Sequence, residues 1–170
     1  KKAGFCGCGR EVKVARAALH FWEEPCISGG QGSGTVFFSG CPLRCVYCQN
    51  YKISRGHTGK EISVERLAEV FLELQSKGAH NINLVTATPY VPQVISALKL
   101  ARPALKIPVV YNSSEYERVE TLRVLKGFVD VYLPDLKHMS SELARRYSGA
   151  ADYFEVATRA LHEMIEQTDG

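Results

Sequence analysis

Three cysteines stand close together in the segment CPLRCVYC, at Cys41, Cys45 and Cys48. A structural zinc site needs four ligands, usually from two separated pairs, whereas an iron–sulfur cluster accepts thiolates from one short loop. A [4Fe–4S] cluster normally takes four thiolates, so three would leave one iron free to bind another molecule. The spacing therefore favours a catalytic [4Fe–4S] cluster. The alternatives are a zinc knuckle or thiols that hold no metal.

The segments around the cysteines alternate between two patterns. Short runs rich in β-branched and aromatic residues predict buried strands at residues 35–39, 81–86, 108–112 and 128–133. Apolar residues at helical spacing predict helices at residues 63–78, 92–101, 115–126, 141–147 and 152–167. Strands that alternate with amphipathic helices pair in parallel through right-handed crossovers. The sequence therefore predicts an α/β fold with about four βα units.

Four βα units are too few to close a (β/α)8 barrel, so we expect a partial barrel. Residues 1–34 are Gly-rich and irregular, with a strand signal only at 12–15, and are predicted to be a lead-in to a barrel domain at 35–170. The last predicted strand leaves an open parallel edge, which either a missing segment or a second copy of the chain would cover. A homodimer through this edge is one expectation.

Ligands of such folds bind at the carboxyl ends of the parallel strands, so the loops at that edge are expected to share a site. These loops read SGCPLRCVYCQN, ATPY, NSSEYE and PDLKHM along the chain. The cysteines thus lie where a parallel α/β fold places its active site.

Composition limits the partners and the compartment. The chain has 170 residues, of which 45% are hydrophobic and 23% charged, and its net charge is +3. No stretch approaches the length of a membrane span, and the basic residues are scattered, so we expect neither a membrane nor a nucleic acid as partner. The first residues, KKAGFCGCGREVKV, lack the apolar stretch of a secretory signal. We therefore expect a cytoplasmic protein with reduced cysteines.

The cysteine segment resembles the CxxxCxxC motif of the radical S-adenosylmethionine superfamily, in which an aromatic residue, here Tyr47, precedes the last cysteine. In that superfamily the open iron of a [4Fe–4S] cluster binds S-adenosylmethionine, and the reduced cluster cleaves it to a 5′-deoxyadenosyl radical. Most of the chain, from RAALHFWEEPCISG to DYFEVATRAL, is similar to an uncharacterised branch related to pyruvate formate-lyase activating enzyme. The resemblance implies a partial radical-SAM barrel, truncated relative to a (β/α)6 core.

The resemblance also implies roles for individual residues. The three cysteines would be the cluster ligands, and Tyr47 would lie by the adenine, with Gln49 and Asn50 as neighbouring cofactor-binding residues. Asp135 and Lys137, in PDLKH, match the DLK motif of the activating enzymes. The aspartate of that motif is associated with a monovalent cation beside the carboxylate of S-adenosylmethionine.

The sequence departs from the activating enzymes after the second predicted strand. Those enzymes have a Gly-Gly-Glu run there, whose backbone meets the methionyl amino group, and this chain has Thr86, Ala87, Thr88 and Pro89. Because threonine hydroxyls can replace part of that hydrogen bonding, we assign Thr86 and Thr88 to the methionyl end. Asn112, which ends the third strand, is either a donor to the ribose or carboxylate or a turn residue.

Partners and rival functions complete the expectations. The resemblance implies a flavodoxin or ferredoxin as electron donor, and a glycyl-radical enzyme or another protein as substrate. The rivals are a non-catalytic zinc or iron–sulfur module, an inactive fragment, and a barrel enzyme that uses Asp135 and Lys137 for acid–base chemistry. Outside the motifs, Cys6 is either the remnant of a second metal site or, like Cys8 and Cys26, a free thiol. Glu23 and Glu24 either line the cleft or, as we favour, form a solvated pair, and we assign no histidine a catalytic role.

Overall fold

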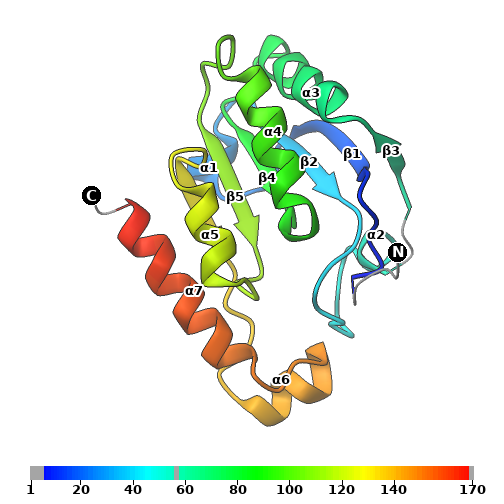
Figure 1. Ribbon diagram of the computed structural model, residues 1–170, viewed down its shortest axis with the longest axis vertical. Coiled ribbons are helices and arrows are strands. Elements are labelled where there is room, and N and C mark those ends of the chain that lie inside the picture. Colours follow the sequence, from blue (N-terminus) through cyan, green and yellow to red (C-terminus); the bar gives the residue numbers. More distant parts are fainter. Residues whose placement is uncertain (1–5, 56–57, 169–170) are drawn as a thin grey trace.

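A single open sheet organises the computed structural model, which describes residues 6–55 and 58–168 (Figure 1). Its strands are β1 (Val12–His20), β2 (Ser33–Phe38), β3 (Lys60–Ile62), β4 (Ile82–Val85), β5 (Val109–Ser113) and β6 (Val131–Pro134). They lie in the order β3-β1-β2-β4-β5-β6. β2, β4, β5 and β6 are parallel, and β1 runs antiparallel to both β2 and β3. The predicted α/β fold with four parallel strands and an unclosed barrel is confirmed.

The larger helices cover one face of this sheet (Figure 1). The helical elements are α1 (Pro25–Ser28), α2 (Tyr51–Ser54), α3 (Val64–Ser76), η1 (Thr88–Tyr90), α4 (Val91–Ala101), α5 (Val119–Leu125), α6 (Ser141–Ser148) and α7 (Tyr153–Thr168). Ser63 begins α3 because its side chain accepts a hydrogen bond from the amide of Arg66. Buried side chains of α3, α4, α5 and α7 form the main core with β4 and β5. Removal of this apolar surface from water stabilises the sheet and fixes where its strands end.

β1 is longer than the sequence predicts, and it belongs to the same sheet as the parallel strands. It spans nine residues and pairs with β2 from Val14 beside Phe38 to His20 beside Ser33. Most of its side chains are only partly buried, and the run VKVARAALH shows no sharp alternation of apolar and polar residues. Sequence periodicity therefore detected only the first few residues of this strand.

The loop between β5 and α5 also differs from the prediction. α5 begins at Val119, whereas helical spacing suggested a start near residue 115. Glu115 has a φ of 60°, in the left-handed region, which a continuous right-handed helix excludes. Glu117 is buried, and its carboxylate accepts hydrogen bonds from the hydroxyls of Thr88 and, at 3.1 Å, of Tyr111. These tertiary bonds hold the segment outside the helix.

Parallel pairing aligns the carboxyl ends of the four central strands. Phe37, Val85, Asn112 and Leu133 lie in one row across β2, β4, β5 and β6. The four loops that carry the predicted chemistry therefore leave the sheet at the same edge. None of the helices in the described part of the chain is both long and apolar enough to cross a bilayer.

Glu117 generates a prediction about stability and pH. Burial raises the pKa of its carboxyl from the ordinary value of 4.5 to about 7, although hydrogen bonds from Thr88 and Tyr111 oppose the shift. Between these values the folded state keeps a proton that the unfolded state has released. The free energy of unfolding should therefore fall by about 1 kcal/mol per pH unit across this window. Urea unfolding at pH 5, 6, 7 and 8 measures that slope.

The matched variants are Glu117→Gln and Glu120→Gln. Glu117→Gln removes the titration, so its stability should change less between pH 5 and 7 than that of the wild type. Glu120 is exposed, and Glu120→Gln should keep the wild-type slope. Identical pH dependence in the wild type and Glu117→Gln would contradict this account.

Candidate functional site

The predicted site residues gather in one cavity of about 820 Å³ at the carboxyl ends of the parallel strands. Such a volume is typical of sites for small molecules and cofactors. All of the assigned residues except Thr88 line it: Cys41, Cys45, Tyr47, Cys48, Gln49, Asn50, Thr86, Asn112, Asp135 and Lys137. Segments almost a hundred residues apart in the sequence thus meet at one place.

The cysteine loop docks on the carboxyl end of α6. The amide of Arg44 donates to the carbonyl of Ser148 at 2.9 Å, and the amide of Val46 donates to the carbonyl of Tyr147 at 2.8 Å. A small apolar cluster lies behind these bonds and includes Leu43, Cys45, Ala144, Tyr153 and Ala157. The loop is therefore fixed by both hydrogen bonds and burial.

Two further features hold the other side of the loop. The guanidinium of Arg55 donates to the carbonyl of Cys45 at 2.8 Å and to the carbonyl of Arg44. Gly40 has a φ of 89°, and a Cβ at this position would collide with the sulfur of Cys8. A glycine directly before Cys41 is therefore required both by the turn and by the neighbouring thiol.

The three thiols of the loop are free and each has a polar neighbour. The amide of Leu43 donates to Cys41 Sγ at 3.4 Å, Cys45 Sγ lies 3.0 Å from Ser148 Oγ, and Cys48 Sγ lies 3.4 Å from Ser54 Oγ. Burial raises the pKa of Cys41 to about 11, the Leu43 amide opposes this shift, and the neighbouring Cys45 and Cys48 add to it. Binding of a metal would release the protons of these thiols.

We compared this donor set with the needs of a metal cluster. Within residues 6–55 and 58–168, no three His, Cys, Asp or Glu side chains are already gathered around a common point that could hold a metal ion. Three thiols from one short loop nevertheless face the same cavity. Thiolates from one loop are the ligands that an iron–sulfur cluster takes, so the residue types fit a [4Fe–4S] cluster.

Asp135 and Lys137 form an ion pair at the cavity wall. The Lys137 side chain is 20% exposed and that of Asp135 is 63% exposed. Burial lowers the pKa of Lys137, but the hydrogen bond and charge of Asp135 outweigh burial and raise it overall. The ammonium therefore stays charged and is available to an anionic group of a ligand.

The hydroxyl of Tyr153 ties this segment to the neighbouring loop. It accepts a hydrogen bond from the amide of Lys137 at 2.9 Å, and the carbonyls of Ser114 and Asp135 lie 2.8 and 3.1 Å away as acceptors for its proton. The Tyr153 side chain is fully buried. One hydroxyl on α7 thus fixes the spacing between the loops that follow β5 and β6.

Thr86 lies in the cavity with strained backbone geometry. Its φ of 57° is in the left-handed region, which a β-branched residue rarely adopts. The resemblance places a glycine of the activating enzymes near this position, and glycine adopts this conformation freely. The Thr86 amide donates to the carbonyl of Asn112 at 2.9 Å, so it is the side-chain hydroxyl that remains for a ligand.

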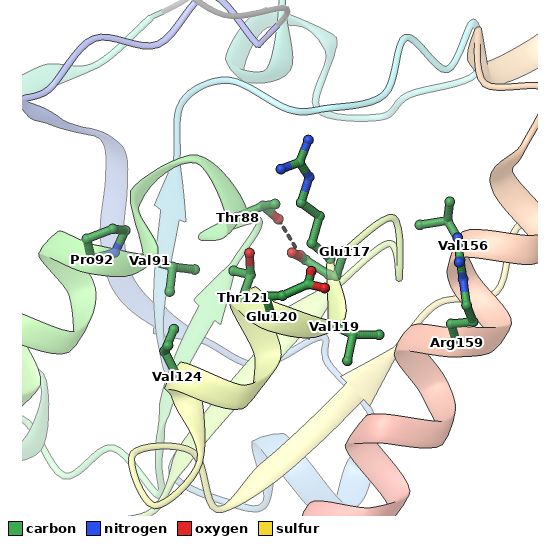
Figure 2. A pocket seen from close by; sticks show the side chains of 11 residues that line it. Thr88, Val91, Pro92, Glu117, Val119, Glu120, Thr121, Val124, Val156 and Arg159 are labelled. Carbon is green, nitrogen blue, oxygen red and sulfur yellow. Dashed lines mark hydrogen bonds between the residues drawn. The ribbon is translucent and has the colours of Figure 1, made fainter.

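Thr88 is the assigned residue that the structure does not bring to the site. It lines a separate cavity of about 700 Å³ together with residues of α4, α5 and α7 (Figure 2). Its hydroxyl donates to the carboxylate of Glu117, as the dashed line in Figure 2 shows. The turn of η1 directs Thr88 toward the helical layer, and sequence alone gave no sign of this turn.

Sequence reasoning missed several residues of the cavity. For Glu23 the sequence favoured a solvated carboxylate over a place in the cleft, but its side chain lines the cavity, is 15% exposed and accepts a hydrogen bond from the Asn112 amide at 3.5 Å. Burial raises the pKa of Glu23, while the neighbouring His20 opposes the shift and Glu24 adds to it. His138 also lines the cavity and lies 2.9 Å from the Tyr47 hydroxyl. If the full length of β1 had been predicted, the HFWEEP segment at its end would have been placed at the site.

Thr86 provides a test of the backbone geometry. A left-handed non-glycine residue costs about 1 to 2 kcal/mol, whereas glycine loses about 0.5 to 1 kcal/mol in backbone entropy. Thr86→Gly should therefore leave the free energy of unfolding unchanged or raise it by up to about 1.5 kcal/mol. Val85→Gly, one position earlier in ordinary strand geometry, should lower it. Urea unfolding compares the two, and equal losses would contradict the assigned strain.

Comparison with known proteins agrees with this geometry. Residues 35–168 match the family model of the Radical SAM superfamily. The chain is also 35% identical, over 174 aligned residues, to an uncharacterized protein of Methanocaldococcus jannaschii. That alignment covers 98% of this chain and 49% of the relative, so the chain spans about half the length of the curated protein it matches. The family match includes the cysteine loop, most of β2 and the whole of β4, β5 and β6, and the chain belongs to the radical SAM superfamily.

Proposed function

We propose that this chain binds a [4Fe–4S] cluster through Cys41, Cys45 and Cys48 and cleaves S-adenosylmethionine reductively. The observation that carries the proposal is the meeting of three free thiols with Asn112, Lys137 and other polar groups in one cavity of about 820 Å³. Family membership supports the same chemistry. Three protein ligands would leave the remaining iron open to the methionyl group of the cofactor.

Reductive cleavage of S-adenosylmethionine consumes one electron, which a separate donor must supply. When bound, a [4Fe–4S] cluster would supply one-electron reduction of the sulfonium, which would break the C–S bond to the 5′ carbon and leave methionine and a 5′-deoxyadenosyl radical. A flavodoxin or ferredoxin would supply the electron that reduces the cluster again. The radical would then take a hydrogen atom from the substrate.

The residues of this chain would bind and orient the cofactor. The Lys137 ammonium suits the methionyl carboxylate, and the exposed carboxylate of Asp135 is free on one side to hold a monovalent cation there. The Thr86 hydroxyl and the Asn112 amide are placed for the amino group or the ribose. The half-exposed ring of Tyr47, with Gln49 and Asn50 beside it, would receive the adenine.

The finer assignment is to an enzyme like pyruvate formate-lyase activating enzyme. The PDLKH segment supports this branch, and hydrogen abstraction from a glycine of a glycyl-radical enzyme or another protein would follow from it. Trp22 is 90% exposed and Leu136 is 46% exposed at the cavity, where apolar surface can contact a protein substrate. A second copy could pair with β6, the edge strand of the sheet. We place the reaction in the cytoplasm.

The first test is anaerobic reconstitution with iron and sulfide, followed by electron paramagnetic resonance of the reduced protein. The wild type should give a [4Fe–4S]⁺ signal that changes when S-adenosylmethionine is added. Cys45→Ala should assemble little or no cluster, whereas Cys26→Ala, which alters an exposed thiol away from the cavity, should behave like the wild type. A wild-type protein that binds zinc and forms no cluster would contradict the proposal.

Asp135 tests the cofactor cleft separately from the cluster. Asp135→Asn removes the negative charge that pairs with Lys137 and that would hold the cation. Cluster content should stay at the wild-type level, while S-adenosylmethionine should bind roughly tenfold more weakly, which corresponds to the loss of one charged contact. Titration of the spectral change with S-adenosylmethionine measures the affinity. Glu142→Gln on exposed α6 is the control, and equal affinity in all three proteins would exclude the role of Asp135.

A further inference from the structure

A polar cluster of four side chains connects the cysteine loop to the end of α6. Ser148 Oγ lies 3.0 Å from Cys45 Sγ, 2.8 Å from His138 Nε2 and 3.3 Å from the hydroxyl of Tyr47. The Tyr47 hydroxyl lies 2.9 Å from His138 Nε2. Ser148 is 1% exposed, so it is the buried centre of this cluster.

Counting donors and acceptors determines the direction of these hydrogen bonds once Cys45 is a thiolate. A serine hydroxyl has one proton to donate and two lone pairs that accept. A thiolate only accepts, so the single proton of Ser148 must point at the sulfur of Cys45. The two remaining neighbours of Ser148 must then be donors, which requires a proton on His138 Nε2 and the O–H of Tyr47. At the 2.9 Å contact between these two neighbours, the tyrosine oxygen is then the acceptor and shares the Nε2 proton with Ser148.

We propose that Ser148 donates a hydrogen bond to the cluster-ligating sulfur of Cys45 and thereby raises the reduction potential of the cluster. This inference rests on the proposed function, because it concerns the same three-cysteine site. Ser148 is a positioning residue that acts through Cys45. His138 and Tyr47 hold the serine hydroxyl in the orientation that the sulfur needs.

The surroundings of Ser148 keep its hydroxyl in place before any cluster binds. Its carbonyl accepts the amide of Arg44, so the serine and the cysteine loop cannot separate without breaking a backbone hydrogen bond. Gly149 ends α6 directly after it, with a φ of 73°. The ring of His138 packs edge-on against Tyr153, with centroids 5.7 Å apart. A donor fixed in this way loses little entropy when it meets a thiolate.

The sign of the effect follows from charge. Reduction adds one negative charge to a cluster and its thiolates, and a hydrogen bond to a ligating sulfur stabilises that charge. Loss of the Ser148 hydroxyl should therefore disfavour the reduced state. At a fixed solution potential, the ratio of reduced to oxidised cluster should fall about threefold to tenfold, and tenfold corresponds to 59 mV for one electron.

The experiment compares three variants after anaerobic reconstitution. Ser148→Ala removes the hydroxyl and leaves the backbone bond to Arg44 intact. Ser148→Thr keeps a hydroxyl at this position. Ser141→Ala changes an exposed serine at the other end of α6 and is the matched control. A potentiometric titration followed by electron paramagnetic resonance gives the midpoint potential, and iron and sulfide analysis gives the cluster content.

The result expected is a more negative midpoint potential in Ser148→Ala, with wild-type values in Ser148→Thr and Ser141→Ala. If Ser148→Ala fails to hold a cluster, a Ser148→Thr protein that keeps both the cluster and the wild-type potential supports the hydroxyl as the needed group. Equal midpoint potentials in the wild type and Ser148→Ala would overturn the inference about Ser148. The proposed function would still be supported if the wild-type signal changes when S-adenosylmethionine is added. A wild-type chain that forms no cluster overturns both.

Discussion

The site depends on the contact between the cysteine loop and the end of α6. Two backbone hydrogen bonds, from Arg44 to Ser148 and from Val46 to Tyr147, fix the loop at its centre. Each such bond contributes only about 1 kcal/mol, so the apolar cluster around Leu43 and Tyr153 must supply much of the attachment. This contact fixes the part of the loop on either side of Cys45, while Arg55 and Gly40 hold its other side. A change at the end of α6 is therefore expected to shift the cysteine loop without altering a cysteine.

The rest of the cavity shows how a well-packed sheet supports strained loops. Thr86 and Glu115 both have left-handed backbone conformations, and they lie one and two residues after the ends of the parallel strands β4 and β5. Such residues persist where the surrounding structure determines their conformation, and they concentrate at functional sites. Here the core beneath β4 and β5 holds them, with Leu84 and Tyr111 fully buried. The helical face supplies the stability, and the opposite face carries the polar groups.

Sequence patterns predicted the parts of the fold and site that local chemistry determines. The four parallel strands and the cysteine loop follow from short runs of residues, whereas Asp135 and Lys137 were assigned through the resemblance. The structure brings the cysteines and this pair to one cavity at the ends of the strands. What sequence reasoning missed depends on tertiary contacts. β1 has weak alternation because both its faces are partly covered, and Thr88 turns away because it bonds to Glu117. Glu23 enters the cavity only because β1 is long enough to carry the next segment across the sheet.

The docking of the cysteine loop also sets an order of events during synthesis. Cys45 and its partner Ser148 are 103 residues apart. A ribosome that adds about 5 to 20 residues per second needs roughly 5 to 20 s to cover that distance. During this interval the cysteines have left the ribosome's active centre without the helix that anchors them. The cluster that we propose would therefore find its complete site only after α6 has been made.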